Sequence, residues 1–443
     1  MALDLKVRQP QFDMLKDAEL RQKTMGEKIL LIEDIAIDGG VFDNVEWKNF
    51  HFKDVDFHDR FVQKSVKNCI FENCEFYRSE FHTFDMEDVT FVNCKTKGAA
   101  VISGQGVSRN VVFKNCDFTD QPETNENYWG VVAVAGEVLY QNCKARHISV
   151  GGFEGEIKLD GCQFEDMTFY AGVASDSPQK FASLTIENCT FKKKVSLMTT
   201  NLDNLTIKNT TFETILTPET IRNSLSIENS KGNYLWFQAK NPIKKISIKN
   251  CEFSAKGEDG GTFYFWRKNG KQIQSENLTI ENVKCGVGGD GSDGGMFQTG
   301  RNTHIKNIEA PRLSFMFQGD SVQIEGAKAT NEATFENAPG QGKMPNVVIS
   351  NFYVANLADF KGVMLPTLII DGYKGNTLDL SDTKIGRLEI KNSRVETLLD
   401  LTNAHVGSGE FSTLSGSKKI KVITKGSNLD VKDGTLYVVP PKA

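Results

Sequence analysis

Aromatic, amide and basic residues recur together in four short stretches, and a sugar chain would bind this combination well. The stretches are YLWFQAK, TFYFWRK, GGMFQTGR and LSFMFQGD, which contain Phe237, Phe265, Phe297 and Phe317. Aromatic faces stack on the apolar faces of sugar rings, amides bind hydroxyl groups, and bases bind uronate carboxylates. The predicted ligand-binding residues are Trp236, Gln238, Lys240, Tyr264, Trp266, Arg267, Lys268, Gln298, Arg301, Gln318 and Asp320.

These residues form one face only if their stretches are strands that lie side by side. Side chains alternate between the two faces of a strand, so inward phenylalanines send their neighbours outward. Alignment on the four phenylalanines predicts a solvent-facing row made of Gln238, Trp266, Gln298 and Gln318. The coils beside this face are long, and their loops would form the sides of a groove over it. The alternative is that the aromatic side chains pack under the loops of their own coils and meet no ligand.

The strands that must position these residues belong to a repeat. Phrases such as LTIEN, LTIKN and LSIEN return every 19 to 32 residues, and each ends in Asn or Gly. Asn and Gly tolerate a left-handed backbone best, so each phrase predicts a short strand that turns sharply at a residue with positive φ. Strand-and-turn repeats of this length are typical of a parallel β-helix. The turn residues are Asn73, Asn93, Asn115, Asn142, Gly161, Asn188, Asn209, Asn229, Asn250, Asn282, Asn307, Gly326, Asn351, Gly372 and Asn392.

Pairs of apolar residues recur every five residues in the N-terminal third, as in Cys69/Phe71, Cys74/Phe76 and Val89/Phe91. Residues 41–96 therefore resemble the pentapeptide-repeat family, whose units place two inward side chains on each face. The longer and less regular coils of residues 65–405 resemble the right-handed β-helix of the pectate-lyase superfamily, with its asparagine ladder. The expected fold is an all-β, single-stranded right-handed parallel β-helix of about sixteen coils.

Both ends of such a solenoid need a cap, because they expose strand edges and a hydrophobic cross-section. Residues 11–28 predict a short amphipathic helix whose Phe12, Leu15 and Leu20 cover the first coil. At the other end, KKIKVITKG and LDVKDGTLYVV predict a closing pair of strands separated by Ser427 and Asn428. The predicted regions are an N-terminal cap (1–40), the β-helix (41–410), and C-terminal capping strands with a tail (411–443).

Seven of the nine cysteines directly follow a turn residue: Cys74, Cys94, Cys116, Cys143, Cys162, Cys189 and Cys251. Their spacing is the coil length and not a metal-ligand spacing, so it predicts a ladder of small, buried, reduced thiols. The stretch GGDGSDGGM (288–296) resembles the calcium-binding nonapeptide of RTX proteins. It occurs once, with its large apolar residue one place late at Met296, so a loop without calcium is favoured. No metal and no cofactor are predicted.

Charge and hydropathy limit the possible partners. The net charge is -5 with both signs interspersed, which gives nucleic acid no electrostatic support. No 18 apolar residues run together, so no transmembrane helix is predicted. The N-terminus lacks the apolar core of a secretory signal, which is expected of a cytoplasmic chain or of an exported one whose signal is absent from this sequence.

The predicted function is that of a non-enzymatic β-helical binding or scaffold protein, which presents an elongated face to a protein partner or a polysaccharide. The alternative is a carbohydrate-active enzyme. A lyase would use a base such as Lys240 or Arg267, whereas a hydrolase needs two carboxylates, for which Asp290, Asp293 and Asp320 are the nearby candidates. Because no acid/base set of that superfamily is recognisable, binding is favoured over catalysis. A third possibility, implied by the pentapeptide resemblance, is a topoisomerase-binding DNA mimic.

Overall fold

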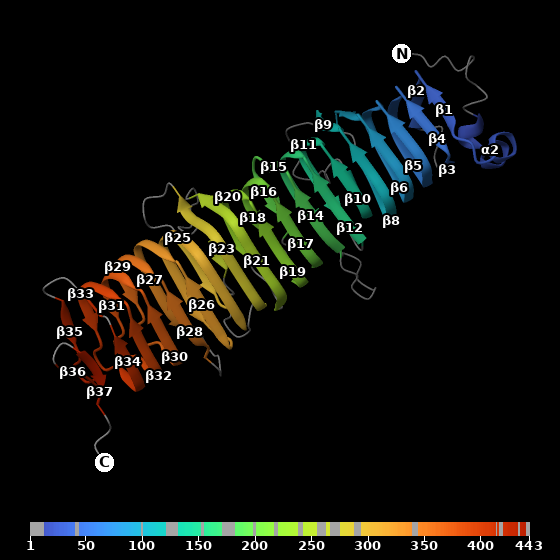
Figure 1. Cartoon of the computed structure of the whole chain (residues 1–443). Coiled ribbons are helices and arrows are strands. Elements are labelled where there is room, and N and C mark those ends of the chain that lie inside the picture. Colours follow the sequence, from blue (N-terminus) through green and yellow to red (C-terminus); the bar gives the residue numbers. More distant parts are fainter. Residues whose placement is uncertain are drawn as a thin grey trace. The chain divides into compact units, whose positions relative to one another are not determined.

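The computed structural model divides the chain into two compact units, Met1–Pro218 and Glu219–Ala443. In Figure 1, unit 1 runs from blue to green and unit 2 from yellow-green to red. The residues described are 13–39, 44–98, 101–120, 132–151, 155–170, 182–197, 201–216, 220–237, 242–254, 263–265, 275–287, 294–338, 344–412, 414–415, 420–432 and 435–439.

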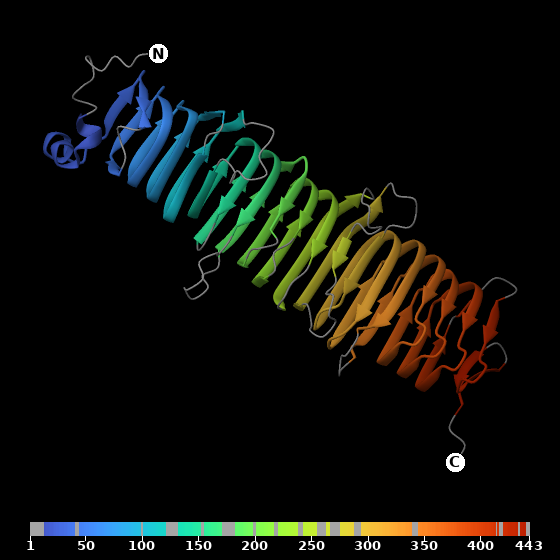
Figure 2. The same ribbon diagram turned by 180° about the vertical axis from the view of Figure 1, so that it is seen from behind.

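Both units have the predicted fold, because their strands stack in parallel as a right-handed β-solenoid. Strands make up 75% of the structure and helix 3%, in about 14 turns rather than the predicted sixteen. The parallel rungs are visible from both sides (Figures 1 and 2). Within unit 1, Phe71 pairs with Phe91 and Phe91 with Phe113, so one residue per coil occupies each place on the sheet.

Unit 1 starts with helical residues 13–16 and α2 (Ala18–Met25), and strands follow. The strands are β1 (Leu30–Glu33), β2 (Ala36–Asp38), β3 (Val45–Lys48), β4 (Phe50–Lys53), β5 (Asp56–Glu72), β6 (Glu75–Val92), β7 (Lys95–Lys97), β8 (Val101–Lys114), β9 (Asp117–Asp120), β10 (Val132–Gln141), β11 (Lys144–Gly151), β12 (Gly155–Asp160), β13 (Gln163–Tyr170), β14 (Ala182–Glu187), β15 (Thr190–Phe191), β16 (Lys194–Ser196), β17 (Asn201–Lys208) and β18 (Thr211–Leu216).

Unit 2 continues with parallel strands and ends in an antiparallel hairpin, β36–β37. Its strands are β19 (Thr220–Glu228), β20 (Lys231–Phe237), β21 (Ile243–Ser254), β22 (Phe263–Phe265), β23 (Ser275–Val287), β24 (Gly294–Gln298), β25 (Asn302–Phe317), β26 (Ser321–Glu325), β27 (Lys328–Asn337), β28 (Asn346–Ser350), β29 (Tyr353–Asp359), β30 (Met364–Asp371), β31 (Lys374–Asp379), β32 (Lys384–Lys391), β33 (Arg394–Asp400), β34 (His405–Ser412), β35 (Lys421–Ile423), β36 (Leu429–Lys432) and β37 (Thr435–Val438).

The predicted turn residues are confirmed at all fifteen positions. The twelve asparagines have φ between 48° and 55°, and the three glycines have φ between 67° and 78°. Most of these asparagines also link coils, as where Asn93 Nδ2 donates to Asn73 Oδ1 at 3.2 Å. Where Gly161 interrupts the ladder, Asn188 Nδ2 donates instead to Asp160 Oδ1 at 2.8 Å. All fifteen turns therefore have the left-handed backbone conformation, whereas the hydrogen bond between coils can change its acceptor. Where the ladder lacks an asparagine, a neighbouring carboxylate can accept this bond.

The N-terminal cap differs from the prediction in the side chains it uses. Leu15 is fully buried as predicted, whereas Leu20 is 40% exposed and does not cover the coil. Arg21 is buried in its place, with its guanidinium carbon 5.1 Å from the centre of the Phe50 ring. The helix is interrupted at Asp17, which caps α2 by accepting a hydrogen bond from the Leu20 backbone N–H, so residues 13–25 do not form the one continuous helix on which the predicted apolar face depended. Phe12 lies outside the described residues.

Parallel stacking already begins with β1, where Leu30 pairs with Phe50. At the other end, the predicted closing pair is wrong. Strand β35, from the first predicted segment, stacks in parallel on β33, with Leu399 opposite Val422. The hairpin β36–β37 forms within the second segment, because Asp433-Gly434, a dipeptide that favours two-residue hairpin turns, separates its halves.

A side chain completes the edge of β34. The backbone N–H of Val406 donates to Asn428 Oδ1 at 2.8 Å, and Asn428 Nδ2 donates to the Val406 carbonyl at 2.7 Å. The carboxamide of Asn428 thus makes the two bonds that a neighbouring strand would make.

Candidate functional site

The predicted binding face lies in unit 2, on β20, β22, β24 and the second half of β25. The parallel register aligns Trp236 with Tyr264, Tyr264 with Met296, and Met296 with Ser314. Met296 and Ser314 are half-buried, while the residues on either side of each are buried. This row of the sheet therefore faces outward at Met296 and Ser314.

Four side chains of the predicted set are described: those of Gln298, Arg301, Gln318 and Asp320. The backbones of Trp236 and Tyr264 are described, but their side chains are not. The remaining predicted residues lie outside the described part of the chain: Gln238, Lys240, Trp266, Arg267 and Lys268. The same holds for Asp290, Asp293 and most of the Gly/Asp-rich stretch.

The phenylalanine alignment is correct for three of the four strands and wrong for the fourth. Phe237 pairs with Phe265 and Phe265 with Phe297, but Phe297 pairs with Phe315 and not with Phe317. Both Phe315 and Phe317 are buried, so alternation alone does not distinguish them. The Phe297 and Phe315 rings stack with centroids 5.5 Å apart, and this contact fixes the register.

Gln298 and Gln318 are fully buried, which corrects the prediction that both face solvent. Gln298 Nε2 donates to Gln318 Oε1 at 3.2 Å, and Gln318 Nε2 donates to the Thr299 carbonyl at 2.5 Å. Gln298 is the last residue of β24 and Gln318 directly follows β25, so the chain turns inward where alternation ends. The two amides satisfy each other inside the coil and are unavailable to a ligand.

Arg301 and Asp320 lie together on neighbouring coils. Arg301 is exposed and Asp320 is half-buried. The backbone N–H of Asp320 donates to the Arg301 carbonyl at 2.7 Å, while the N–H of Arg301 donates to the Ser275 carbonyl at 2.8 Å. This corner therefore holds an exposed arginine between β24 and β25.

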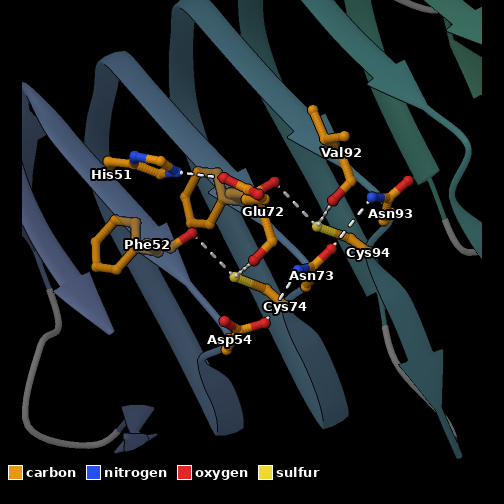
Figure 3. Close-up of polar contacts among 10 residues, drawn as sticks. His51, Phe52, Asp54, Glu72, Asn73, Cys74, Val92, Asn93 and Cys94 are labelled. Carbon is orange, nitrogen blue, oxygen red and sulfur yellow. Dashed lines mark hydrogen bonds and ion pairs between the residues drawn. The ribbon is translucent and has the colours of Figure 1, made fainter. Parts of the chain in front are cut away.

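The cysteines form the predicted buried ladder. All nine are free thiols and are buried. Cys74 Sγ donates to the carbonyls of Phe52, one coil earlier, and of Glu72, two residues earlier, at 3.4 and 3.5 Å (Figure 3). Burial raises the pKa of Cys69 to about 12 and that of Cys251 to about 11. Cys69 and Cys251 therefore stay protonated near neutral pH, and the thiolate is the reactive form of cysteine.

Two histidine–carboxylate pairs link coils on the surface of unit 1. His51 Nε2 lies 2.9 Å from Glu72 Oε2 (Figure 3), and His147 Nδ1 lies 2.7 Å from Asp166 Oδ2. Each contact joins residues on neighbouring coils, as lysine–glutamate pairs such as Lys97 with Glu75 also do. Within the described ranges, no three His, Cys, Asp or Glu side chains gather as a metal site would require.

Sequence reasoning missed an outward row on a different face of unit 2. The residue two places after each turn residue occupies this row, and parallel pairing aligns Lys328, Tyr353, Lys374 and Arg394. The signal was present in the sequence as a fixed offset from Gly326, Asn351, Gly372 and Asn392.

The chain matches no protein-family model, no curated protein and no solved structure. Among the described residues, no helix has both the length and the apolar character needed to cross a membrane.

Proposed function

We propose that this chain is a non-enzymatic binding or scaffold protein, and that it presents the face of unit 2 on β20, β22, β24 and β25 to a partner or glycan. The observation that carries the proposal is the register row of Trp236, Tyr264, Met296 and Ser314, which lies beside the buried Phe297 and Phe315. Arg301 adds an exposed positive charge at the end of the same strands.

Parallel pairing suits this row to an extended partner. Each coil contributes one residue, and neighbouring coils are about 4.8 Å apart, so the row offers contacts at a constant interval. Buried rings support it from within, as where Phe315 and Phe335 stack with centroids 5.3 Å apart. A support of this kind holds the outward residues in place before binding, which lowers the entropic cost of association.

The test is calorimetric titration of the full chain with a panel of neutral and anionic oligosaccharides, followed by Trp236→Ala and Tyr264→Ala. Each change is expected to weaken binding by about 1–3 kcal/mol, as the loss of an aromatic anchor does. Tyr77→Ala is the matched control, because Tyr77 is an exposed aromatic residue in unit 1. Its affinity should equal that of the original chain.

Three outcomes would change the proposal. An unsaturated product absorbing in the near ultraviolet would show lyase activity and replace the non-enzymatic part. If no oligosaccharide of the panel binds, the glycan part of the proposal is excluded and a protein partner remains. If Trp236→Ala and Tyr264→Ala both unfold the chain, these aromatics belong to the core and the face does not exist.

A further inference from the structure

Four consecutive residues of the row that follows the turn residues in unit 2 combine an exposed aromatic ring with cations, and the residue before them in the row is Glu309. Lys328 pairs with Tyr353, Tyr353 with Lys374, and Lys374 with Arg394, on four successive coils. We call these four residues the basic stripe. Tyr353 is 43% exposed, and the side chains of Lys328 and Arg394 are 48% and 59% exposed.

The cations differ in how far they are already paired. Lys328 Nζ lies 2.6 Å from Glu309 Oε1, and Arg394 forms an ion pair with Glu396. Lys374, next to the tyrosine, has no ionic partner in the part of the chain that the structure describes. The charge available to an anion is therefore greatest one coil beyond the aromatic ring.

Exposed amides accompany the stripe. Asn356 lies three residues after Tyr353, and Asn376 lies two residues after Lys374, and both are exposed. Asn356 Nδ2 donates to Asn331 Oδ1 at 2.7 Å, which leaves the Asn356 carbonyl oxygen as an acceptor. Among the described residues Asn376 has no hydrogen-bond partner, so both its donors and its acceptor are available.

We propose that the basic stripe binds a linear anionic polysaccharide, with one sugar ring stacked on Tyr353 and a carboxylate or sulfate of the next ring on Lys374. Tyrosine supplies a flat apolar face with little side-chain entropy to lose. The ammonium group of Lys374 pairs with the acidic group, and the amides of Asn356 and Asn376 meet ring hydroxyls. Coils about 4.8 Å apart place these contacts at an interval close to the length of one sugar unit.

Single-stranded nucleic acid fits the stripe less well. Such ligands are bound by a continuous basic groove with several aromatic platforms. The stripe has one aromatic ring, and the carboxylates of Glu309 and Glu396 adjoin its two ends. A phosphate on every nucleotide would meet these carboxylates, whereas an acidic sugar chain with hydroxyl groups also satisfies the amides.

The test is calorimetric titration of the full chain with an oligogalacturonate at low ionic strength. The original chain should bind it, and added salt should weaken the binding, because exposed charge pairs are screened. The methyl-esterified oligomer has the same backbone without the charge and should bind more weakly. An oligodeoxythymidylate of equal charge should bind more weakly than the oligogalacturonate.

Four variants then locate the site. Tyr353→Ala is expected to raise the Kd by about tenfold, as the loss of an aromatic anchor does. Tyr353→Phe should stay within about twofold, because the ring face is retained. Lys374→Gln should raise the Kd by about threefold, the usual scale of one exposed charge pair. Lys361→Gln, which removes another exposed lysine of unit 2, should leave the Kd unchanged.

The stripe is overturned if the original chain does not bind oligogalacturonate, if the oligodeoxythymidylate binds as well, or if Tyr353→Ala binds as the original chain does. It is also overturned if Tyr353→Phe loses as much affinity as Tyr353→Ala. Trp236→Ala separates the stripe from the proposed function. Loss of binding in Trp236→Ala but not in Tyr353→Ala would support the face on β20, β22, β24 and β25 and overturn the stripe. Loss of binding in Tyr353→Ala but not in Trp236→Ala would support the stripe and not that face.

Discussion

The residue directly behind the sharp turn differs between the two units, although the turn itself does not. In unit 1 this position holds cysteine in six coils and then Thr210, whereas in unit 2 it varies from Ser230 and Cys251 to Val283, Phe352 and Tyr373. All of these side chains are buried. From Asn73 to Asn392, each of these coils nevertheless turns at an Asn or Gly with positive φ, and the two coils before them turn at Asp34 and Asp54, also with positive φ. The backbone conformation is the strict requirement, and the coil accepts many inner side chains behind it.

The cores differ in the same way. Unit 1 stacks aromatic rings from coil to coil, with Phe91 centred 4.7 Å from Phe71 and 4.6 Å from Phe113. The last coils of unit 2 are filled mainly by aliphatic side chains, among them the fully buried Leu378 and Leu388. Parallel in-register stacking serves both kinds of core, because identical or similar residues meet their counterparts one coil away.

The largest expected effect sharpens this difference between the cores. Phe91→Ala should lower the free energy of unfolding by about 4 kcal/mol, and Leu378→Ala by about 3 kcal/mol, because each leaves a cavity that rigid coils cannot close. Phe91 loses contacts with two stacked rings in addition. Denaturant unfolding of both variants measures the difference. A loss below about 1 kcal/mol for Phe91→Ala would mean that the aromatic stack is not a rigid core.

Turn substitutions should affect both units equally. Asn209→Val in unit 1 and Asn250→Val in unit 2 should each cost about 3 kcal/mol, because a β-branched residue resists positive φ and the ladder hydrogen bonds are lost. Asn209 Nδ2 donates to Asn188 Oδ1 at 3.1 Å, and Asn250 Nδ2 donates to Asn229 Oδ1 at 3.0 Å. The glycine variants at both sites should cost about 1 kcal/mol, from the lost hydrogen bonds alone. Equal costs for Val and Gly in thermal unfolding would contradict the role of the backbone conformation.

The buried thiol of Cys251 should make stability depend on alkaline pH. Burial raises the pKa of Cys251 from 9.0 to about 11 in the folded chain. Between these two values the thiol ionises in the unfolded chain but not in the folded one, so stability is full below pH 9.0 and falls as pH rises towards about 11. Cys251→Ser removes this titration, and its melting temperature should fall less steeply over the same range. Parallel melting curves for the two proteins would mean that Cys251 titrates normally.

The smallest effect is expected where one ladder residue is exchanged for another found in the same ladder. Cys189→Ser should cost less than about 1 kcal/mol, because the new hydroxyl has a hydrogen-bond acceptor two residues back. Cys189 Sγ already donates to the Glu187 carbonyl at 3.0 Å, and Thr210 and Ser230 make the equivalent hydroxyl bonds at 2.8 Å. A loss above about 2 kcal/mol would show an unsatisfied buried hydroxyl instead.

Local sequence signals predicted the repeat well, because positive φ and alternation are properties of single residues and their neighbours. The turns at Asn73 to Asn392 and the buried thiols followed from residue type and offset alone. Pairing between coils of unequal length was harder to predict. The stretch FMF offers two inward phenylalanines, and only contact with the next coil selects Phe315 over Phe317.

The candidate site shows where alternation stops being informative. Gln298 ends its strand and Gln318 follows one, and there the chain direction, rather than the strand period, decides what is buried. Arg21 is buried where Leu20 was expected, and the helical period did not predict this because the helix is broken at Asp17. The basic stripe could have been found from the sequence by counting two residues from each turn.

The carboxamide of Asn428 also bears on how such a chain can change its length. It occupies the hydrogen-bonding position beside Val406 that another coil would need, and the hairpin β36–β37 packs on the same strand through Val438 beside Gly409, so one side chain and one short hairpin close the last coil. Each coil contacts only its neighbours, so the duplication of a whole coil between two turn asparagines would not change the closed C-terminal end. The protein can therefore gain or lose length by internal duplication or deletion, while its terminus stays the same.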